Sequence, residues 1–222
     1  MPKTGTQWLV NAAMRAGLAD GHHNHRPARA LAGTWDLIVA ITREPCGWIS
    51  SWWEHCRHGT KIGNLRTYGG GSADLPDVVY GITHPTTDRI PDEIPAIIEG
   101  NRTDGSLDEW KAGLVATGGL WSWMHRYMYG DRYAWKGGPW RWAVDVLLVT
   151  SRLIEGFSEL ASPVTAESHP AVNVRNSNRH RHLWTDDMVR WVYDADRELI
   201  DLFGFTPFRP PAWSVWHAKA VS

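Results

Sequence analysis

Cysteine and long apolar runs are scarce in this chain, and each scarcity excludes a class of protein. The two cysteines, Cys46 and Cys56, are too few for a disulfide framework. No apolar stretch approaches the roughly 20 residues that a membrane-spanning helix needs. The chain does not open with a signal peptide, so we expect a cytoplasmic location. A net charge of −1 gives no support for sequence-independent binding to nucleic acids.

The remaining composition is that of a folded domain with two biases. Hydrophobic residues make up 43% of the 222 residues and charged residues 21%, which fits one globular domain covering residues 1–222. Only five of the 23 basic residues are lysines, and arginine suits forked recognition of phosphate or sulfate. GC-rich coding sequence explains the same bias without any function. The second bias is the 15 tryptophans, many of which lie between Trp110 and Trp142.

The first eight residues contain the clearest candidate binding motif. Gly5 lies between Thr4 and Thr6, follows Lys3, and precedes an apolar run with helical spacing. Such a turn directs consecutive backbone N–H groups and the positive end of the following helix at one anion. The motif therefore predicts a phosphate or sulfate site, although an ordinary Thr-Gly turn that caps a helix would look the same. It lacks the Gly-Lys-Ser/Thr ending of a Walker motif.

The string Pro2-Lys-Thr-Gly-Thr-Gln-Trp-Leu9 resembles the 5′-phosphosulfate loop of the sulfotransferases that use 3′-phosphoadenosine 5′-phosphosulfate (PAPS). The resemblance implies that Trp8 stacks on adenine and that the phosphosulfate is held by Lys3, Thr4, Gly5, Thr6 and Gln7. Gln7 stands where the family usually has a hydroxyl residue. In the family this loop follows a central parallel strand, and only Met1 precedes it here, so we expect the first strand to be short or to lie upstream of residue 1.

A short apolar run, Trp35–Ile41, contains several β-branched residues and predicts a buried parallel strand. The next residues resemble the 3′-phosphate element of the same family, in which a serine follows an arginine by eight residues, as Ser51 follows Arg43 here. Pro45 fits the first turn of the intervening helix. An arginine fork and a serine hydroxyl can converge on one phosphate, so Arg43 and Ser51 are predicted to bind it. Glu44 replaces the usual Asn or Asp.

The histidine-rich segment Gly21–Pro27 contains the candidate catalytic base. His25-Arg-Pro is similar to the His-x-Pro of many family members, in which the histidine removes the acceptor proton, and an unperturbed histidine titrates in the useful range. Two other interpretations stay open: a plain polar loop, and a zinc site formed by His22, His23 and His25. Some branches of the family use a glutamate base, which the sequence does not exclude. Sulfuryl transfer requires no metal, so we expect none.

The expected fold is a three-layer α/β domain of the P-loop-like sulfotransferase type, with a mostly parallel sheet between helices. Val144–Val149 predicts a second buried strand of that sheet. The Ser151–Glu155 segment stands where glycan-type members have Glu-x-Leu, and Arg179 lies in a basic loop that loosely resembles one reaching the nucleotide. The end of the chain, Val192–Phe205, resembles the closing helix of the family, with its Tyr-x-x-Asp followed by Gly-Tyr/Phe.

The local pattern predicts further elements. Helices are expected over residues 6–17, over 106–129 with a weak point at Gly118-Gly119, over 151–161, and from the N-cap Thr185 to Gly204. Residues 92–99 suggest a short helix, and residues 59–88, rich in Gly, Pro and Asp, are expected to be mostly loop. The aromatic residues from Trp121 to Trp142 predict either core packing, a lid, or a platform for a sugar.

The function that the resemblance implies is transfer of a sulfuryl group from PAPS to a hydroxyl or amine of a glycan, lipid or small-molecule acceptor. The alternative is a degenerate or kinase-like nucleotide-binding domain without sulfotransferase activity. The spacing of Arg43 and Ser51 favours the first, and the absent Glu-x-Leu and first strand favour the second. The expected partners are the nucleotide and the acceptor, and we expect neither nucleic-acid binding nor a membrane span.

Overall fold

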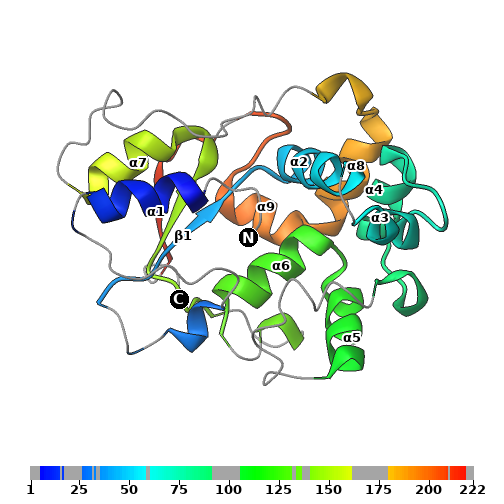
Figure 1. The fold of residues 1–222 in the computed structure, drawn as a ribbon, viewed down its shortest axis with the longest axis horizontal. Helices are drawn as coiled ribbons and strands as arrows, with labels where there is room; N and C mark the ends of the chain where they lie inside the picture. The colour runs from blue at the N-terminus through cyan, green and yellow to red at the C-terminus, as the bar shows by residue number, and fades with distance from the viewer. Residues whose placement is uncertain are drawn as a thin grey trace.

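A small three-stranded sheet with helices on both faces organises the described part of the chain (Figure 1). The computed structural model describes residues 6–15, 17, 27–31, 33, 36–58, 61–91, 106–131, 134–136, 141–161, 180–209 and 211–218. The strands are β1 (Val39–Thr42), β2 (Val146–Val149) and β3 (Val215–His217). The helices are α1 (Thr6–Arg15), α2 (Pro45–Arg57), α3 (Ile62–Tyr68), α4 (Leu75–Thr83), α5 (Leu107–Thr117), α6 (Leu120–Tyr129), α7 (Leu153–Leu160), α8 (Asp186–Ala195) and α9 (Arg197–Phe203).

The sheet has the order β1-β2-β3 and joins the two strands that the sequence predicts. β1 and β2 pair in parallel, with Val39 opposite Val146, so the prediction that both runs are strands of one sheet is confirmed. β3 pairs with β2 in the antiparallel direction, with Leu147 opposite Trp216. Among the described strands, the expected mostly parallel sheet is therefore half parallel and half antiparallel.

The two faces of the sheet bury separate apolar clusters, as the alternation of side chains along a strand requires. On one face, Ile41, Val146 and Leu148 pack with α1 and α7 through side chains that include Ala12 and Phe157. On the other face, the alternate residues of the same strands join a larger cluster formed mainly by α2–α6, α8 and α9. Helices thus lie on both faces of the small sheet, and this mixed structure is compatible with the expected α/β class.

The helix boundaries follow capping signals that are visible in the sequence. Ser106 caps α5 in a capping box with Glu109, and Gly118, with φ of 88°, ends that helix as the predicted weak point. Thr185 caps α8. Gly204, with φ of 64°, ends α9, but the expected single closing helix is interrupted at Asp196.

The prediction of loop over residues 59–88 is wrong, because the structure has α3 and α4 there. Pro76 lies in the first turn of α4, where proline is tolerated, and Val78, Val79 and Ile82 supply its buried face. One glycine of this segment, Gly81, serves close packing of the two helices. A Cβ on Gly81 would lie 1.9 Å from the carbonyl oxygen of Tyr68, so α3 and α4 approach each other at this glycine. Residues 92–99, predicted as a short helix, lie outside the described residues.

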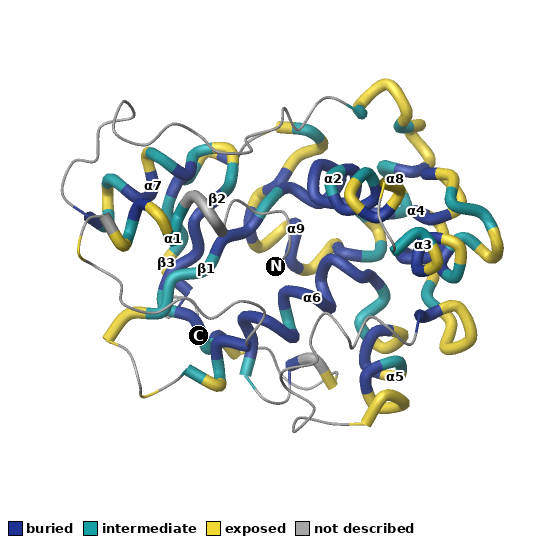
Figure 2. Tube along the Cα trace, viewed as in Figure 1, coloured by how far each residue is buried: buried dark blue, intermediate teal, exposed yellow. Residues whose placement is uncertain are grey.

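The aromatic residues of α6 form core, which decides between core packing and a sugar platform for this helix. Trp121 and Tyr127 are 0% exposed, and Trp123 and Tyr129 are also buried. Figure 2 shows α6 as a largely buried helix. Tyr133 and Trp140 lie outside the described residues, as does the side chain of Trp135. Within the described residues, no helix is both long enough and apolar enough to cross a membrane.

Candidate functional site

The carboxyl ends of the parallel strands β1 and β2 define the candidate site. β1 ends at Thr42 and leads through Arg43 and Glu44 into α2, whereas β2 leads through a short 3₁₀ turn, Thr150–Arg152, into α7. Parallel strands end at the same edge of a sheet, and ligands of open α/β sheets bind outside that edge. The register, with Thr42 opposite Val149, places the two strand ends side by side.

Arg43 and Ser51 are the two predicted site residues whose side chains the structure describes. Both are half-buried. Burial lowers the pKa of the Arg43 guanidinium from its usual value, and the nearby charge of Glu44 opposes that shift. Ser51 lies seven positions, or about two helical turns, after Glu44. It therefore lies on the same face of the helix as Glu44, about 10 Å further along the helix axis.

The neighbouring Ser50 has a structural role instead. It is buried, donates to the carbonyl oxygen of Cys46 over 2.8 Å, and accepts from the indole nitrogen of Trp184 over 2.8 Å. Because both hydroxyl interactions of Ser50 are within the protein, the half-exposed Ser51 is the better candidate of the pair for a ligand.

Glu44 is the N-cap of α2, which explains why a carboxylate follows Arg43. Its carboxylate accepts from the backbone nitrogens of Cys46, at 3.0 Å, and Gly47, at 2.7 Å. The hydroxyl of Tyr193 donates to the same carboxylate over 3.3 Å. Burial raises the pKa of Glu44, and the hydrogen bonds from Gly47 and Cys46 oppose the rise. The first amides of α2 are thus bonded to the protein itself, so a phosphate at this junction would depend on side chains.

A fully buried histidine, His125, contacts the last residue of β1. Its Nε2 is 2.7 Å from the Thr42 hydroxyl, and its Nδ1 is 2.9 Å from the carbonyl oxygen of Trp121. Burial lowers the pKa of His125 to about 3, so the ring is neutral at physiological pH. The sequence alone does not predict this residue as part of the site. The one feature that points to it is its position four residues after Trp121, on the same face of an aromatic helix.

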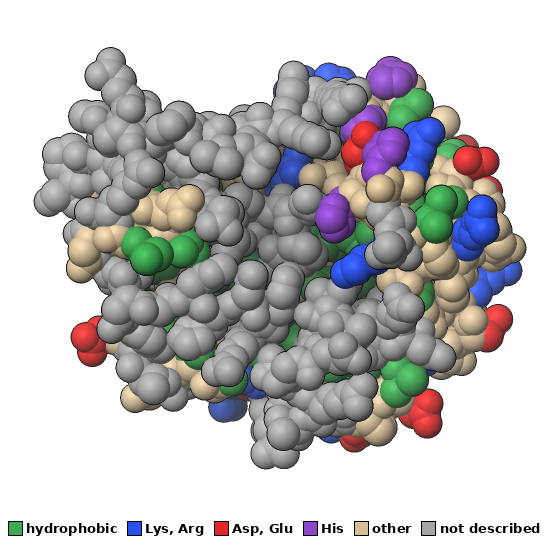
Figure 3. All heavy atoms as spheres, in the orientation of Figure 1, with side chains coloured by type: hydrophobic (Ala, Val, Ile, Leu, Met, Phe, Trp, Pro, Cys, Tyr) green, Lys and Arg blue, Asp and Glu red, His purple; other side chains and the backbone are tan. Residues whose placement is uncertain are grey.

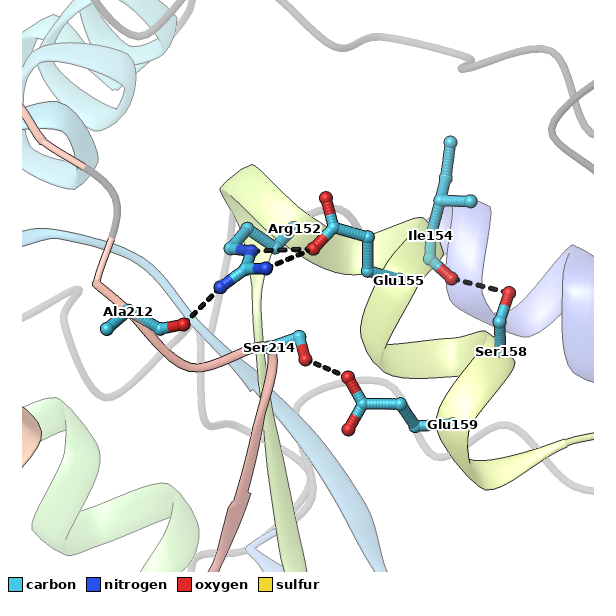
Figure 4. A network of polar contacts seen from close by, with 7 residues as sticks. All are labelled: Arg152, Ile154, Glu155, Ser158, Glu159, Ala212 and Ser214. Carbon is cyan, nitrogen blue, oxygen red and sulfur yellow. Dashed lines mark hydrogen bonds and ion pairs between the residues drawn. The ribbon is translucent and has the colours of Figure 1, made fainter.

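The end of β2 carries an ion pair where the family has its Glu-x-Leu (Figure 4). Arg152 contacts Glu155 over 2.6 Å and also donates to the carbonyl oxygen of Ala212. Further along α7, Ser214 bonds to Glu159. Glu155 therefore pairs with the neighbouring Arg152 and helps attach α7 to the segment that precedes β3.

The other predicted site residues lie mostly beyond the described part of the chain. Lys3, Thr4, Gly5, His25 and Arg179 are outside the described residues, as are His22 and His23 of the alternative zinc site. Thr6, Gln7 and Trp8 form the start of α1, as predicted for the helix that follows the loop, but their side chains are not described. The structure accordingly places Arg43 and Ser51 on one strand–helix junction and leaves the loop and the base as sequence predictions.

Histidine and cationic side chains gather at the other end of the molecule, near α2, α4 and α8 (Figure 3). There Glu54 lies 3.2 Å from His58 and 3.6 Å from His180. Among the residues that the structure describes, no group of three or more His, Cys, Asp or Glu side chains could hold a metal ion.

Comparisons with protein-family models, with curated proteins and with solved structures find no match to this chain.

Proposed function

We propose that this chain is a PAPS-dependent sulfotransferase of the P-loop-like type, acting on a hydroxyl or amine of a glycan, lipid or small molecule. The observation that carries the proposal is the strand–Arg43–helix junction. Arg43 follows a strand that is paired in parallel, α2 begins two residues later at Pro45, and Ser51 lies two turns into that helix. In this local structure an arginine and a serine eight residues apart can reach one phosphate.

The chemistry requires an anion cradle, a cation near the leaving oxygen and a base. In the proposed mechanism the acceptor oxygen or nitrogen attacks the sulfur of PAPS in line. The bond between sulfur and the 5′-phosphate oxygen breaks, and adenosine 3′,5′-bisphosphate (PAP) leaves. Lys3 and the backbone of Thr4–Gln7 stabilise the charge on the departing phosphate. His25 accepts the proton of the acceptor.

The contacts with the nucleotide determine which sulfuryl donor the protein binds. Arg43 and Ser51 bind the 3′-phosphate and so distinguish PAPS from ATP, while Trp8 stacks on adenine. Arg179 contributes from the late basic loop. Because Glu44 already occupies the first amides of α2, the selectivity for the 3′-phosphate depends on the side chains of Arg43 and Ser51.

The test compares binding of PAP with binding of adenosine 5′-monophosphate (AMP), which lacks the 3′-phosphate, by calorimetry. Wild-type protein should bind PAP more tightly. Arg43→Ala and Ser51→Ala should each weaken PAP binding by about 1.5–3 kcal/mol, the worth of a charged hydrogen bond, and leave AMP binding nearly unchanged. Arg190→Ala is the control, because Arg190 forms an exposed ion pair with Asp187 on α8.

Two outcomes contradict the proposal. Equal losses for PAP and AMP would place Arg43 and Ser51 away from the 3′-phosphate. Binding of ATP in preference to PAP would favour the kinase-like alternative.

A further inference from the structure

Side-chain donors bind three successive backbone carbonyls at the carboxyl end of β1. The pairs are the Tyr129 hydroxyl with the Ile41 carbonyl at 2.6 Å, the Thr150 hydroxyl with the Thr42 carbonyl at 2.9 Å, and the Trp121 indole nitrogen with the Arg43 carbonyl at 3.1 Å. Two of these donors belong to α6, and the third follows β2.

Successive backbone carbonyls of a strand point to opposite sides, so these three carbonyls point in two directions. Thr42 directs its carbonyl toward β2, whose following residue Thr150 supplies the donor. The carbonyls of Ile41 and Arg43 therefore point to the opposite side of β1. There α6 supplies both donors, so this helix occupies the edge of β1 that β2 leaves open.

His125 ties α6 to β1 a second time and defines its own tautomer. The carbonyl oxygen of Trp121 can only accept, so Nδ1 of His125 carries the proton and Nε2 accepts from the Thr42 hydroxyl. Trp121, His125 and Tyr129 recur every four residues on one face of α6, and all three are buried. One face of α6 thus holds the end of β1 through the carbonyls of Ile41 and Arg43 and through the hydroxyl of Thr42.

We propose that Trp121 is a positioning residue for Arg43 and that, with the support of Tyr129, it sets the selectivity of the site for a nucleotide with a 3′-phosphate. The inference rests on the proposed function. Trp121 holds the carbonyl of Arg43, and Thr150 holds the carbonyl of the preceding residue, Thr42, so the peptide groups on both sides of the Arg43 Cα are restrained. The direction of the guanidinium follows from that restraint.

The length of arginine makes this restraint important. A tilt of about 10° at the Cα of an extended arginine moves its guanidinium by about 1 Å, which is the scale of misplacement that loosens a designed or natural site. A mobile Arg43 would still bind an anion, but with less preference for one phosphate position. The loss therefore appears in selectivity between PAP and AMP, which a purely structural tryptophan would not change.

The experiment compares Trp121→Phe with Trp123→Phe. Both tryptophans are buried on α6, but the indole nitrogen of Trp123 has no hydrogen-bond partner among the described residues. Each change removes a similar volume, whereas only Trp121→Phe frees the Arg43 carbonyl. The readouts are hydrogen exchange of the amides of residues 38–46 and the dissociation constants for PAP and AMP.

Trp121→Phe should accelerate exchange in residues 38–46 and weaken PAP binding about three- to tenfold, the range for one lost hydrogen bond, with AMP binding unchanged. Trp123→Phe should change neither quantity. If Trp121→Phe fails to fold, Tyr129→Phe tests the neighbouring contact of α6 with β1, at the Ile41 carbonyl, by removing one hydroxyl. Its control is Tyr68→Phe, because the buried Tyr68 hydroxyl has no partner within the described structure.

The two proposals fail in different ways. Wild-type protein that does not prefer PAP to AMP overturns the proposed function and, with it, this role of Trp121. Wild-type protein that prefers PAP, with the preference intact in Trp121→Phe and Tyr129→Phe, overturns only the positioning role. Equal acceleration of exchange in the Trp121 and Trp123 variants also overturns it, because general loosening of α6 would then explain the result.

Discussion

Asp196 provides a prediction that depends on no assumption about function. It lies between α8 and α9, is 2% exposed, and accepts from the backbone nitrogen of Ser122 over 2.9 Å, which caps α6 from a distant part of the chain. A Cβ on Gly119 would lie 2.1 Å from its Oδ1, so only glycine leaves room for the carboxylate. Burial raises the pKa of Asp196 from 3.8 to about 6, although the hydrogen bonds from Ser122 lower it.

The raised pKa means that Asp196 binds its proton more tightly in the folded protein than in the unfolded chain. The folded state therefore binds more protons than the unfolded state between pH 3.8 and about 6, and the contribution of this group to stability falls as the pH rises through that window. The difference of about two between the two pKa values corresponds to about 3 kcal/mol. That stabilisation is present below pH 3.8 and lost above about pH 6.

Asp196→Asn should remove this pH dependence, because the amide cannot ionise and its oxygen can still accept from Ser122. Urea unfolding from pH 4 to pH 8 would measure it. The free energy of unfolding of the variant, relative to wild type, should rise by about 2 kcal/mol between pH 4 and pH 7, since part of the full difference lies below pH 4. Asp194→Asn is the control, because Asp194 forms an exposed ion pair with Arg197, and its effect should stay within about 1 kcal/mol. A difference between Asp196→Asn and wild type that does not change with pH would refute the reasoning.

The remaining predictions concern packing and catalysis. Gly81→Ala should destabilise the protein by about 3 kcal/mol or more in urea unfolding, because the new Cβ meets the Tyr68 carbonyl. Gly63→Ala, which meets no atom within 4 Å in α3, should be neutral or stabilising by up to about 1 kcal/mol, and equal effects would contradict the packing argument. In transfer assays, Lys3→Ala should weaken PAP binding and slow transfer. His25→Ala should keep PAP binding and lower kcat about 10²–10⁴-fold, whereas full turnover would end its assignment as base and stoichiometric loss of zinc would favour a metal site.

The sequence predicts the elements whose signals are local. The apolar runs give β1 and β2, Ser106 and Thr185 give two helix starts, and Gly118 and Gly204 give two helix ends. Each of these signals acts within a few residues, through backbone conformation or a capping hydrogen bond.

The misses at α4 and at the break between α8 and α9 arise where a glycine or an aspartate serves a distant contact. Gly81 was interpreted as part of a loop, but its missing side chain lets α4 approach Tyr68. The break at Asp196 was also not predicted, because the partner that this carboxylate caps is Ser122, 74 residues away. Similarly, β3 is a short strand that depends on pairing with β2, and no strong apolar run marks it.

Only part of the candidate site follows from the sequence. The spacing of Arg43 and Ser51 predicts a strand–helix junction, and the structure has that junction with the helix starting at Pro45. The residues that hold it, Trp121 and His125, could not be found in the same way. They are about 80 residues away in the chain, and their aromatic pattern is equally typical of ordinary core.

The closing helix explains how these distant parts depend on one another. Its Tyr-x-x-Asp, which the family resemblance assigns to architecture, is Tyr193 and Asp196 in this chain. Tyr193 donates to Glu44, the cap of α2, and Asp196 caps α6 at Ser122. The motif therefore holds the start of α2 and the start of α6, which are the two elements that restrain Arg43.

Neither residue contacts a ligand in the proposed site, but loss of either should disturb the position of Arg43. The two losses act through different elements. Removal of the Tyr193 hydroxyl acts on the residue after Arg43, whereas removal of the Asp196 carboxylate acts on the helix that carries Trp121. A pattern at the end of the chain is thereby connected to the carboxyl end of its first described strand. This connection gives a physical reason for the motif to occur together with the strand–Arg43–helix junction. The buried carboxylate of Glu44 needs a hydrogen-bond donor, and the backbone at the start of α6 needs an acceptor.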